Sequence, residues 1–139
     1  MYRVYDSVNK TWVPKDKILI STFNNDIYMR KRGLFGTEKL ELVSNEKFII
    51  HESIGVLDKN NVLIYEGDIC ELELNDGTAK CVVSYVPERA AYILFDNENM
   101  LYYEFVKGMS DSLTVIGNVF DNADEINVEN EKEEMEEEE

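Results

Sequence analysis

The sequence has a single histidine, two cysteines and two prolines in 139 residues. The lone His51 gives no basis for a Ser-His-Asp arrangement, and with two separated cysteines it does not make a metal-binding pattern. No apolar run approaches the roughly 18–20 residues that cross a membrane. The first six residues lack the basic-then-apolar pattern of a signal peptide. We therefore expect a cytoplasmic protein, in whatever cell makes it.

The two cysteines, Cys70 and Cys81, fall in segments that we expect to be neighbouring strands. A disulfide between them is geometrically possible, but a reducing compartment disfavours it. Cysteine is also one of the most frequently buried small residues. We expect two free, buried thiols.

Negative charge dominates the chain, but it is unevenly distributed along the sequence. The net charge is −15 overall, made up of +3 in residues 1–50, −8 in residues 51–120 and −10 in residues 121–139. Packed like charges resist collapse and helix formation, so we expect residues 128–139 to be a disordered acidic tail. The tail could keep the protein soluble, dock on a basic surface by imitating nucleic-acid phosphate, or fold over Arg30-Lys31-Arg32.

The apolar pattern favours strands throughout, and eight tyrosines and six phenylalanines add to this preference. Short apolar segments alternate with turn residues, and Asn75-Asp76-Gly77 gives the strongest hairpin signal. Residues 51–120 form a meander of strands, which predicts a small, strongly bent antiparallel barrel that is SH3-like in architecture. Residues 1–50 are expected to be a β extension packed on this barrel, because they contain little core material of their own.

Two segments carry the most information: Gly55-Val-Leu-Asp-Lys-Asn-Asn-Val-Leu-Ile-Tyr-Glu-Gly-Asp-Ile69 and Leu113-Thr-Val-Ile-Gly-Asn-Val-Phe-Asp-Asn122. Together they resemble the YopX family of small phage and prophage proteins. Asn61 stands where the family usually has glycine, and Ala123 stands where it has proline. The resemblance implies a single domain over residues 1–127 and a phage or prophage origin. The motif residues are Tyr65, Glu66, Gly67, Asp68, Gly117 and Asn118.

Glu66-Gly67-Asp68 is the segment that most invites a catalytic interpretation. Two carboxylates held on one turn could bind a divalent cation or act as acid and base. Alternatively, Gly67 permits a bend or bulge while Asp68 bonds to backbone groups of the turn. No second cluster supplies further ligands, and no phosphate-binding glycine loop is present. We expect no catalytic residues, no metal site and no cofactor.

The cluster Arg30-Lys31-Arg32, expected at the start of a loop near Tyr28, Phe35 and Trp12, could contact nucleic-acid phosphates with aromatic rings available for stacking. It could equally be a solvated, charged loop. We expect a phage- or prophage-encoded, non-catalytic accessory protein that binds a host or phage macromolecule, with a protein as the favoured partner. The alternative is a weak nucleic-acid-associated module that uses this basic loop. The sequence identifies neither the partner nor the oligomeric state.

Overall fold

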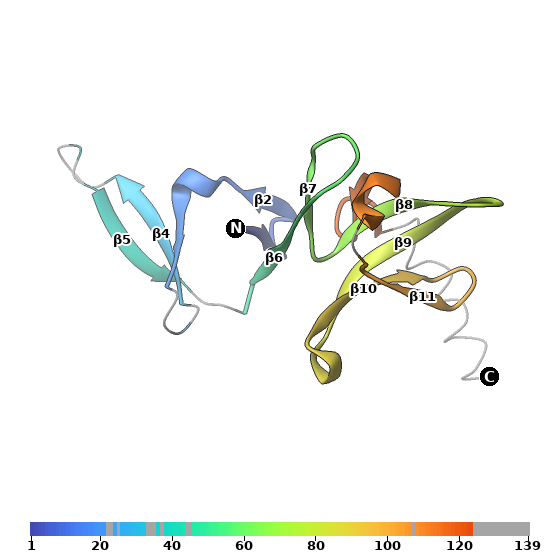
Figure 1. The fold of residues 1–139 in the computed structure, drawn as a ribbon. Helices are drawn as coiled ribbons and strands as arrows, with labels where there is room; N and C mark the ends of the chain where they lie inside the picture. The colour runs from blue at the N-terminus through green and yellow to red at the C-terminus, as the bar shows by residue number, and fades with distance from the viewer. Residues whose placement is uncertain are drawn as a thin grey trace. The chain divides into compact units, whose positions relative to one another are not determined.

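The structure of the chain, a computed structural model, describes residues 1–21, 24, 26–32, 36, 38–43, 46–106 and 108–123 (Figure 1). The predicted acidic tail, residues 128–139, lies outside these residues. The chain divides into two compact units, Met1–Glu52 and Ser53–Glu139, and one long strand, β6 (Phe48–Leu57), carries the chain from the first unit into the second. Each unit is described by itself below.

The N-terminal unit contains two small antiparallel sheets. In the first, β1 lies between β2 and the first half of β6, and in the second, β4 lies between β3 and β5. A 3-10 turn, η1 (Lys15–Lys17), connects β2 to β3. The strands of these two sheets, apart from β6, are β1 (Tyr2–Asp6), β2 (Thr11–Val13), β3 (Ile18–Ile20), β4 (Ile27–Arg32) and β5 (Glu38–Val43).

This unit has a hydrophobic core of its own, in which four buried residues meet: Val4, Ile18, Ile27 and Phe48. Partly buried side chains such as Met29 and Val43 pack around them. The expectation that residues 1–50 contain too little core material was therefore wrong. The reason is that the apolar residues are spread thinly over six strand segments, and only the pairing of those segments concentrates them.

The C-terminal unit is built from a meander of consecutive hairpins that ends by returning to its beginning. Its main sheet has the strand order β11-β10-β9-β8-β12, so the last strand pairs with the first strand of the meander. The second half of β6 pairs with β7 beside it. The strands are β7 (Leu63–Tyr65), β8 (Asp68–Leu74), β9 (Gly77–Val86), β10 (Ala91–Asp96), β11 (Leu101–Glu104) and β12 (Leu113–Asn118).

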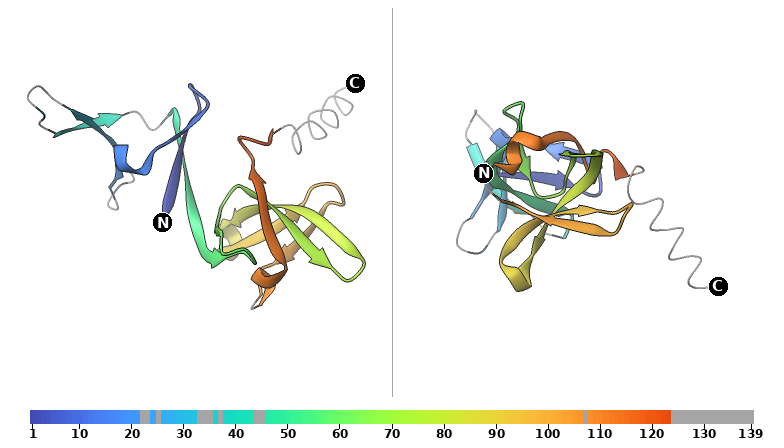
Figure 2. Two further views of the ribbon diagram at one scale, coloured as in Figure 1. Left: turned by 90° about the horizontal axis from the view of Figure 1, so that it is seen from above. Right: turned by 45° about the vertical axis from the view of Figure 1, so that its right-hand side comes forward.

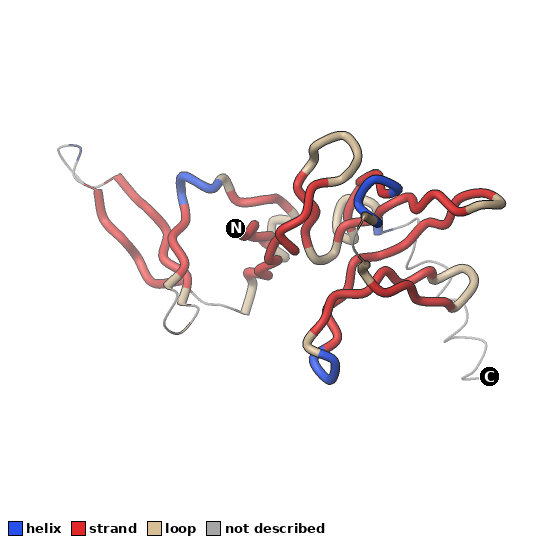
Figure 3. Tube along the Cα trace, viewed as in Figure 1, coloured by secondary structure: helices blue, strands red, loops and turns tan. Residues whose placement is uncertain are grey.

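The main sheet curls strongly into a half-barrel, as both views in Figure 2 show. Its concave side holds a buried cluster: Ile64, Cys70, Leu72, Ala79, Cys81, Val83, Leu94 and Leu113. Two short 3-10 turns also belong to this unit, η3 (Pro87–Arg89) and η4 (Met109–Ser112) (Figure 3). The predicted mainly β fold with a bent antiparallel sheet is confirmed.

Two hairpins, one in each unit, use the same turn chemistry. Asp6 ends β1 and Asp96 ends β10, and each carboxylate accepts hydrogen bonds from the backbone amides two and three residues later. The side-chain amide of the asparagine three residues on, Asn9 or Asn99, donates to the second carboxylate oxygen at 2.8 Å in both hairpins. In both hairpins the spacing is Asp-x-x-Asn. The aspartate accepts hydrogen bonds from backbone amides of the turn that have no partner in a neighbouring strand.

One prediction about the N-terminal unit needs correction. Lys31 and Arg32 were expected in a loop, but β4 continues to Arg32 and both residues have partners in β5. The strand extends because its register continues along β5, pairing Lys31 with Lys39 and Arg32 with Glu38.

Candidate functional site

The two motif segments of the sequence meet in the C-terminal unit, although they lie almost fifty residues apart. Strand β12 pairs with β8 so that Asn118 lies opposite Asp68 and Gly117 opposite Ile69, with an irregularity in register between Val115 and Gly117. We call the meeting point of Tyr65, Glu66, Gly67, Asp68, Gly117 and Asn118 the motif junction. The fold thus brings all six predicted motif residues together.

Gly67 is held from both sides at the motif junction. Its amide donates to the carbonyl of Val83 at 2.8 Å, and its own carbonyl accepts from the amide of Val119 at 2.9 Å. Its φ is +81°, in the left-handed region that only glycine enters without strain. Gly67 therefore connects β9 to the end of β12 through a backbone conformation that a side chain would disfavour.

Asp68 is buried, and one of its carboxylate oxygens, Oδ2, accepts a hydrogen bond of 2.8 Å from the amide of Tyr65. This bond closes the turn between β7 and β8. Glu66, the other acid of the pair, is half-buried on the same turn. The contact supports the interpretation in which Asp68 bonds to turn backbone groups, because the carboxylate is used within the fold.

Asn118 and Asn122 organise the exit from β12. The side-chain carbonyl of Asn118 accepts from the amides of Phe120 and Asp121, and the Oδ1 of Asn122 accepts from the Asn118 amide at 3.2 Å. A Cβ on Gly117 would lie only 2.3 Å from that same Oδ1. A side chain at position 117 would therefore displace the Asn122 side chain, which hydrogen-bonds to the Asn118 amide.

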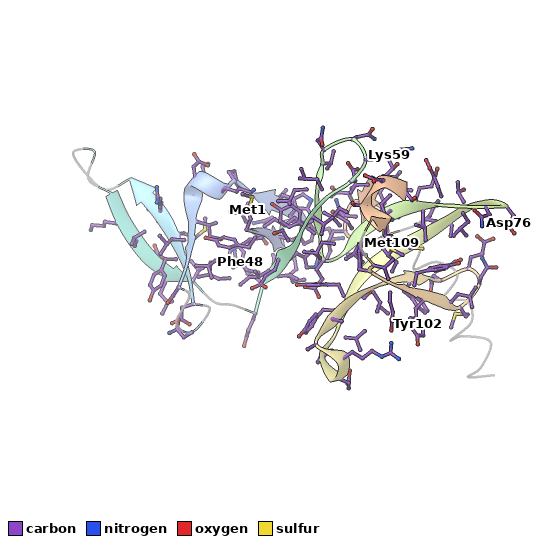
Figure 4. The ribbon with its side chains drawn as sticks, viewed as in Figure 1. Met1, Phe48, Lys59, Asp76, Tyr102 and Met109 are labelled. Carbon is purple, nitrogen blue, oxygen red and sulfur yellow. The ribbon has the colours of Figure 1, made fainter. Side chains whose placement is uncertain are left out.

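Asp58, which the sequence did not single out, makes a third link between the two motif segments. Its Oδ1 accepts from the amides of Asn60 and Val62, and its Oδ2 accepts from the amide of Val115 at 2.9 Å. Lys59, at the tip of the same loop, donates its amide to the carbonyl of Leu113 (Figure 4). Burial acts to raise the pKa of Asp58, but the three backbone hydrogen bonds outweigh it and hold the pKa below its usual value.

Metal ligation and thiol chemistry find little support. Among the residues that the structure describes, no three of His, Cys, Asp and Glu are grouped so as to hold a metal ion.

Cys70 and Cys81 lie directly opposite each other on β8 and β9, and both are free and buried, as predicted. Burial raises the pKa of Cys70 to about 12 and that of Cys81 to about 11. Thiolates are therefore scarce at neutral pH, and the two side chains act as core residues.

The lone histidine lies on one face of the sheet formed by β1, β2 and β6. His51 is only 9% exposed, its ring centre is 6.3 Å from that of Trp12, and the Arg3 guanidinium stacks 4.6 Å above the same indole. Burial, together with the positive charge of Arg3, lowers the pKa of His51 to about 4. The imidazole is therefore neutral in the folded protein at pH 7.

This histidine gives a prediction about acid stability. The unfolded chain binds a proton at His51 below about pH 6.5, whereas the folded chain does so only near pH 4. The free energy of unfolding should therefore fall as pH drops from 6.5 to 4, with His51 accounting for about 3 kcal/mol of that loss. In urea unfolding, the His51→Gln variant should lack this component, so the difference between the two proteins should shrink or reverse toward pH 4. Parallel stability curves for wild type and His51→Gln between pH 6.5 and 4 would contradict the assignment to His51.

Asp6 and Asp58 affect stability over a different pH range from His51. The pKa values of Asp6 and Asp58 are lowered, so their contribution to stability is present at pH 5 and is lost only below about 3.8.

Arg30 and Lys31 of the basic cluster do not lie in one patch. Arg30 and Lys31 are successive residues of strand β4, so their side chains project from opposite faces of the sheet. Lys31 is paired with Glu41, with Nζ and Oε2 2.6 Å apart. Arg32 lies at the end of β4, and its side chain is outside the described part. A phosphate could therefore not contact Arg30 and Lys31 on the same face of the sheet.

The sheet of β3, β4 and β5 has an unexpected surface on the side away from its core. Cross-strand register places Leu19, Tyr28 and Leu42 in one row and Arg30 beside Leu40 in the next. The three leucines are 38%, 59% and 56% exposed in the order Leu19, Leu42 and Leu40. We call these five residues the docking face. The alternation of leucines with charged residues in β5 indicates that Leu40 and Leu42 share a face. The register that aligns them with residues of β3 and β4 cannot be inferred from the sequence.

A small cavity in the C-terminal unit was also not predicted. It has a volume of about 150 Å³ and is lined by Val86, Arg89, Ile93 and Tyr102, the last of which is labelled in Figure 4. The guanidinium of Arg89 lies 5.2 Å from the Tyr102 ring centre, and its Nη1 is 2.5 Å from a carboxylate oxygen of Glu104. The charge at the cavity wall is thus already compensated within the hairpin, and the hollow offers apolar surface.

Known proteins resemble this chain over most of its length. The family model described as "YopX protein" matches residues 1–127. Protein yopX from Bacillus subtilis is similar in structure, with a TM-score of 0.60 and 16% identity over 88% of this chain and 94% of that one. Protein EF1440 from Enterococcus faecalis has a TM-score of 0.55 and 24% identity over 90% and 96% of the two chains. No curated protein matches. Among the described residues, no helix is long and apolar enough to cross a membrane.

Proposed function

The chain belongs to the YopX protein family, and from this premise we propose that it is a non-catalytic accessory protein that binds a protein of the phage or prophage that encodes it, or of the bacterial host. The family resemblance implies a phage or prophage origin, and with that origin we propose the cytoplasm of the bacterial host as the place of action. The docking face of the N-terminal unit is the single observation that carries the binding role.

The docking face is unusual for a surface that only contacts water. Scattered exposed leucines are normal on proteins, but contiguous apolar side chains on one sheet face are typical of interaction sites. Leu19, Leu40 and Leu42 are contiguous through Tyr28, and Arg30 lies at the edge of the group. The combination of exposed aliphatic groups, a tyrosine and an arginine resembles the composition of protein interfaces.

A nucleic-acid partner is less consistent with the same residues. Phosphate binding requires several cations on one face, whereas Arg30 and Lys31 project from opposite faces of β4 and Lys31 is paired with Glu41. Of the five residues on the docking face, only Tyr28 has an aromatic ring on which a base could stack. A protein partner therefore explains more of the surface.

Affinity capture from host lysate tests this function. Tagged wild-type protein should retain a protein partner that the Leu40→Ser/Leu42→Ser variant loses, while the control variant Leu57→Ser/Leu101→Ser, which changes two exposed leucines of the C-terminal unit, retains it. An apolar interface should survive 0.5 M NaCl. Capture that is lost in salt and after nuclease treatment would instead support the nucleic-acid alternative. Capture unaffected by the Leu40/Leu42 substitutions would contradict a role for the docking face.

A further inference from the structure

Strand β5 (Glu38–Val43) lies at the border of its sheet. It pairs with β4 along six residues, and within the described part of the chain no strand pairs with its other side. A border strand presents backbone amide and carbonyl groups in the spacing that another extended chain can satisfy. The outer side of β5 is therefore a place where a partner's strand could be added.

The side chains of β5 fix what such an added strand must contain on one face. Leu40 and Leu42 point to the docking face, and both are more than half exposed. Residues directly opposite in neighbouring strands share a face and lie about 4.5–5.5 Å apart at Cβ. A strand beside β5 would therefore place alternate residues against Leu40 and Leu42, and apolar side chains would remove these leucines from water.

The charges around β5 fix what the remaining residues must be. Lys39 lies directly opposite Lys31, a like-charged pair of the kind that destabilises a sheet. Glu41 pairs with Lys31. Lys39 is exposed, and no ion pair joins it to another described side chain, whereas Arg30 lies with Leu40 on the docking face, the other face of the sheet. On the face of β5 that carries Lys39, a carboxylate of the added strand is the complement of this cation.

Building on the proposed function, we propose that the outer side of β5 binds an extended segment of a partner protein in which apolar side chains alternate with carboxylates. Backbone hydrogen bonds to β5 supply part of the affinity. The apolar residues pack on Leu40 and Leu42, and a carboxylate opposite Lys39 neutralises the Lys31–Lys39 pair. A nucleic acid could provide the negative charge but not the strand backbone.

A synthetic probe tests this recognition directly. The acetylated, amidated peptide Glu-Val-Glu-Val-Glu-Val-Glu, labelled with fluorescein, is titrated with the full-length protein and followed by fluorescence anisotropy. We expect Leu40→Ser/Leu42→Ser to weaken binding at least tenfold and Lys39→Glu at least threefold. The controls Leu57→Ser/Leu101→Ser and Lys10→Glu should leave it unchanged. Circular dichroism and thermal unfolding establish that each variant is folded.

Modified peptides separate strand addition from simple charge attraction. The rearranged peptide Glu-Glu-Val-Val-Val-Glu-Glu has the same composition and should bind at least tenfold more weakly. N-methylation of the three valines blocks one side of the peptide backbone and N-methylation of the inner glutamates blocks the other, so one of these two peptides should lose binding while the other keeps it. Equal binding of all four peptides, or no effect of Lys39→Glu, would overturn the proposal.

The outcomes also distinguish this inference from the proposed function. If the peptide does not bind but capture from lysate still depends on Leu40 and Leu42, the docking face binds a partner of other chemistry and only the strand-addition inference fails. If neither experiment depends on these leucines, both proposals fail.

Discussion

Replacing Asp58 by alanine should lower the free energy of unfolding by about 3 kcal/mol, because it leaves three backbone amide donors in part-buried hydrogen bonds without their acceptor. The carboxylate accepts from the amides of Asn60, Val62 and Val115, and the side chain is 5% exposed. Two of these bonds shape the loop between β6 and β7, while the third holds β12 against that loop. The substitution therefore damages a turn and a tertiary contact together.

Urea unfolding of Asp58→Ala measures this loss. The Asp58→Asn variant separates the contribution of the turn amides from that of the Val115 amide. The amide variant keeps one acceptor oxygen for the turn amides, but its NH2 group must face the amide of Val115, so we expect a loss of about 2 kcal/mol. Glu98→Ala is the matched control, because Glu98 is an exposed turn acid, and it should change stability by less than about 0.5 kcal/mol. A loss at Asp58 no larger than this control would refute the role of the buried carboxylate.

Gly67→Val should be the next most damaging substitution, lowering stability by roughly 1–3 kcal/mol through backbone strain. The cause is the φ of +81°, which a β-branched residue avoids. The backbone can escape this strain only by moving, and movement breaks the bonds to Val83 and from Val119. The substitution should loosen β9 and the end of β12 as well as the turn itself.

Thermal unfolding with calorimetry, and amide hydrogen exchange, measure the Gly67→Val effect. Thr78→Val places the same side chain at an exposed strand position in β9 and should be nearly neutral or slightly stabilising. Faster exchange at the Val119 amide in Gly67→Val would locate the damage at the motif junction. An unchanged melting temperature together with unchanged exchange at Val119 would mean that valine is accommodated at this φ.

Local signals in the sequence were sufficient for the strands and for most turns. Alternation in Asp68–Leu74 and the turn residues Asn75-Asp76-Gly77 predicted the β8–β9 hairpin, which the structure contains. These features depend only on neighbours in the chain, so a periodic pattern can reveal them. The six motif residues were identified through the resemblance of two segments to the YopX family, and not from a local pattern alone.

Features set by distant parts of the chain could not be predicted in the same way. The sequence pattern around Asp58 is that of an ordinary turn acid. Only the fold brings the amide of Val115, fifty-seven residues later, to its carboxylate. Strand alternation places Ile69 on the face of β8 that carries the exposed Glu71 and Glu73, yet Ile69 is fully buried, opposite Gly117. The docking face arises from the register of three strands, and a single strand pattern does not specify register with its neighbours.

The return of the last strand to the first has a consequence for the order of events during synthesis. Strands β8 to β11 can each pair with a neighbour that has just left the ribosome, since the meander consists of successive hairpins. Strand β8, however, receives its second partner only when β12 has been translated. Until Leu113–Asn118 emerges, β8 and the loop around Asp58 have no cover on that side. A ribosome that stalls before this point leaves a nascent chain with an open, apolar strand border, the feature that chaperones and proteases recognise in unfinished proteins.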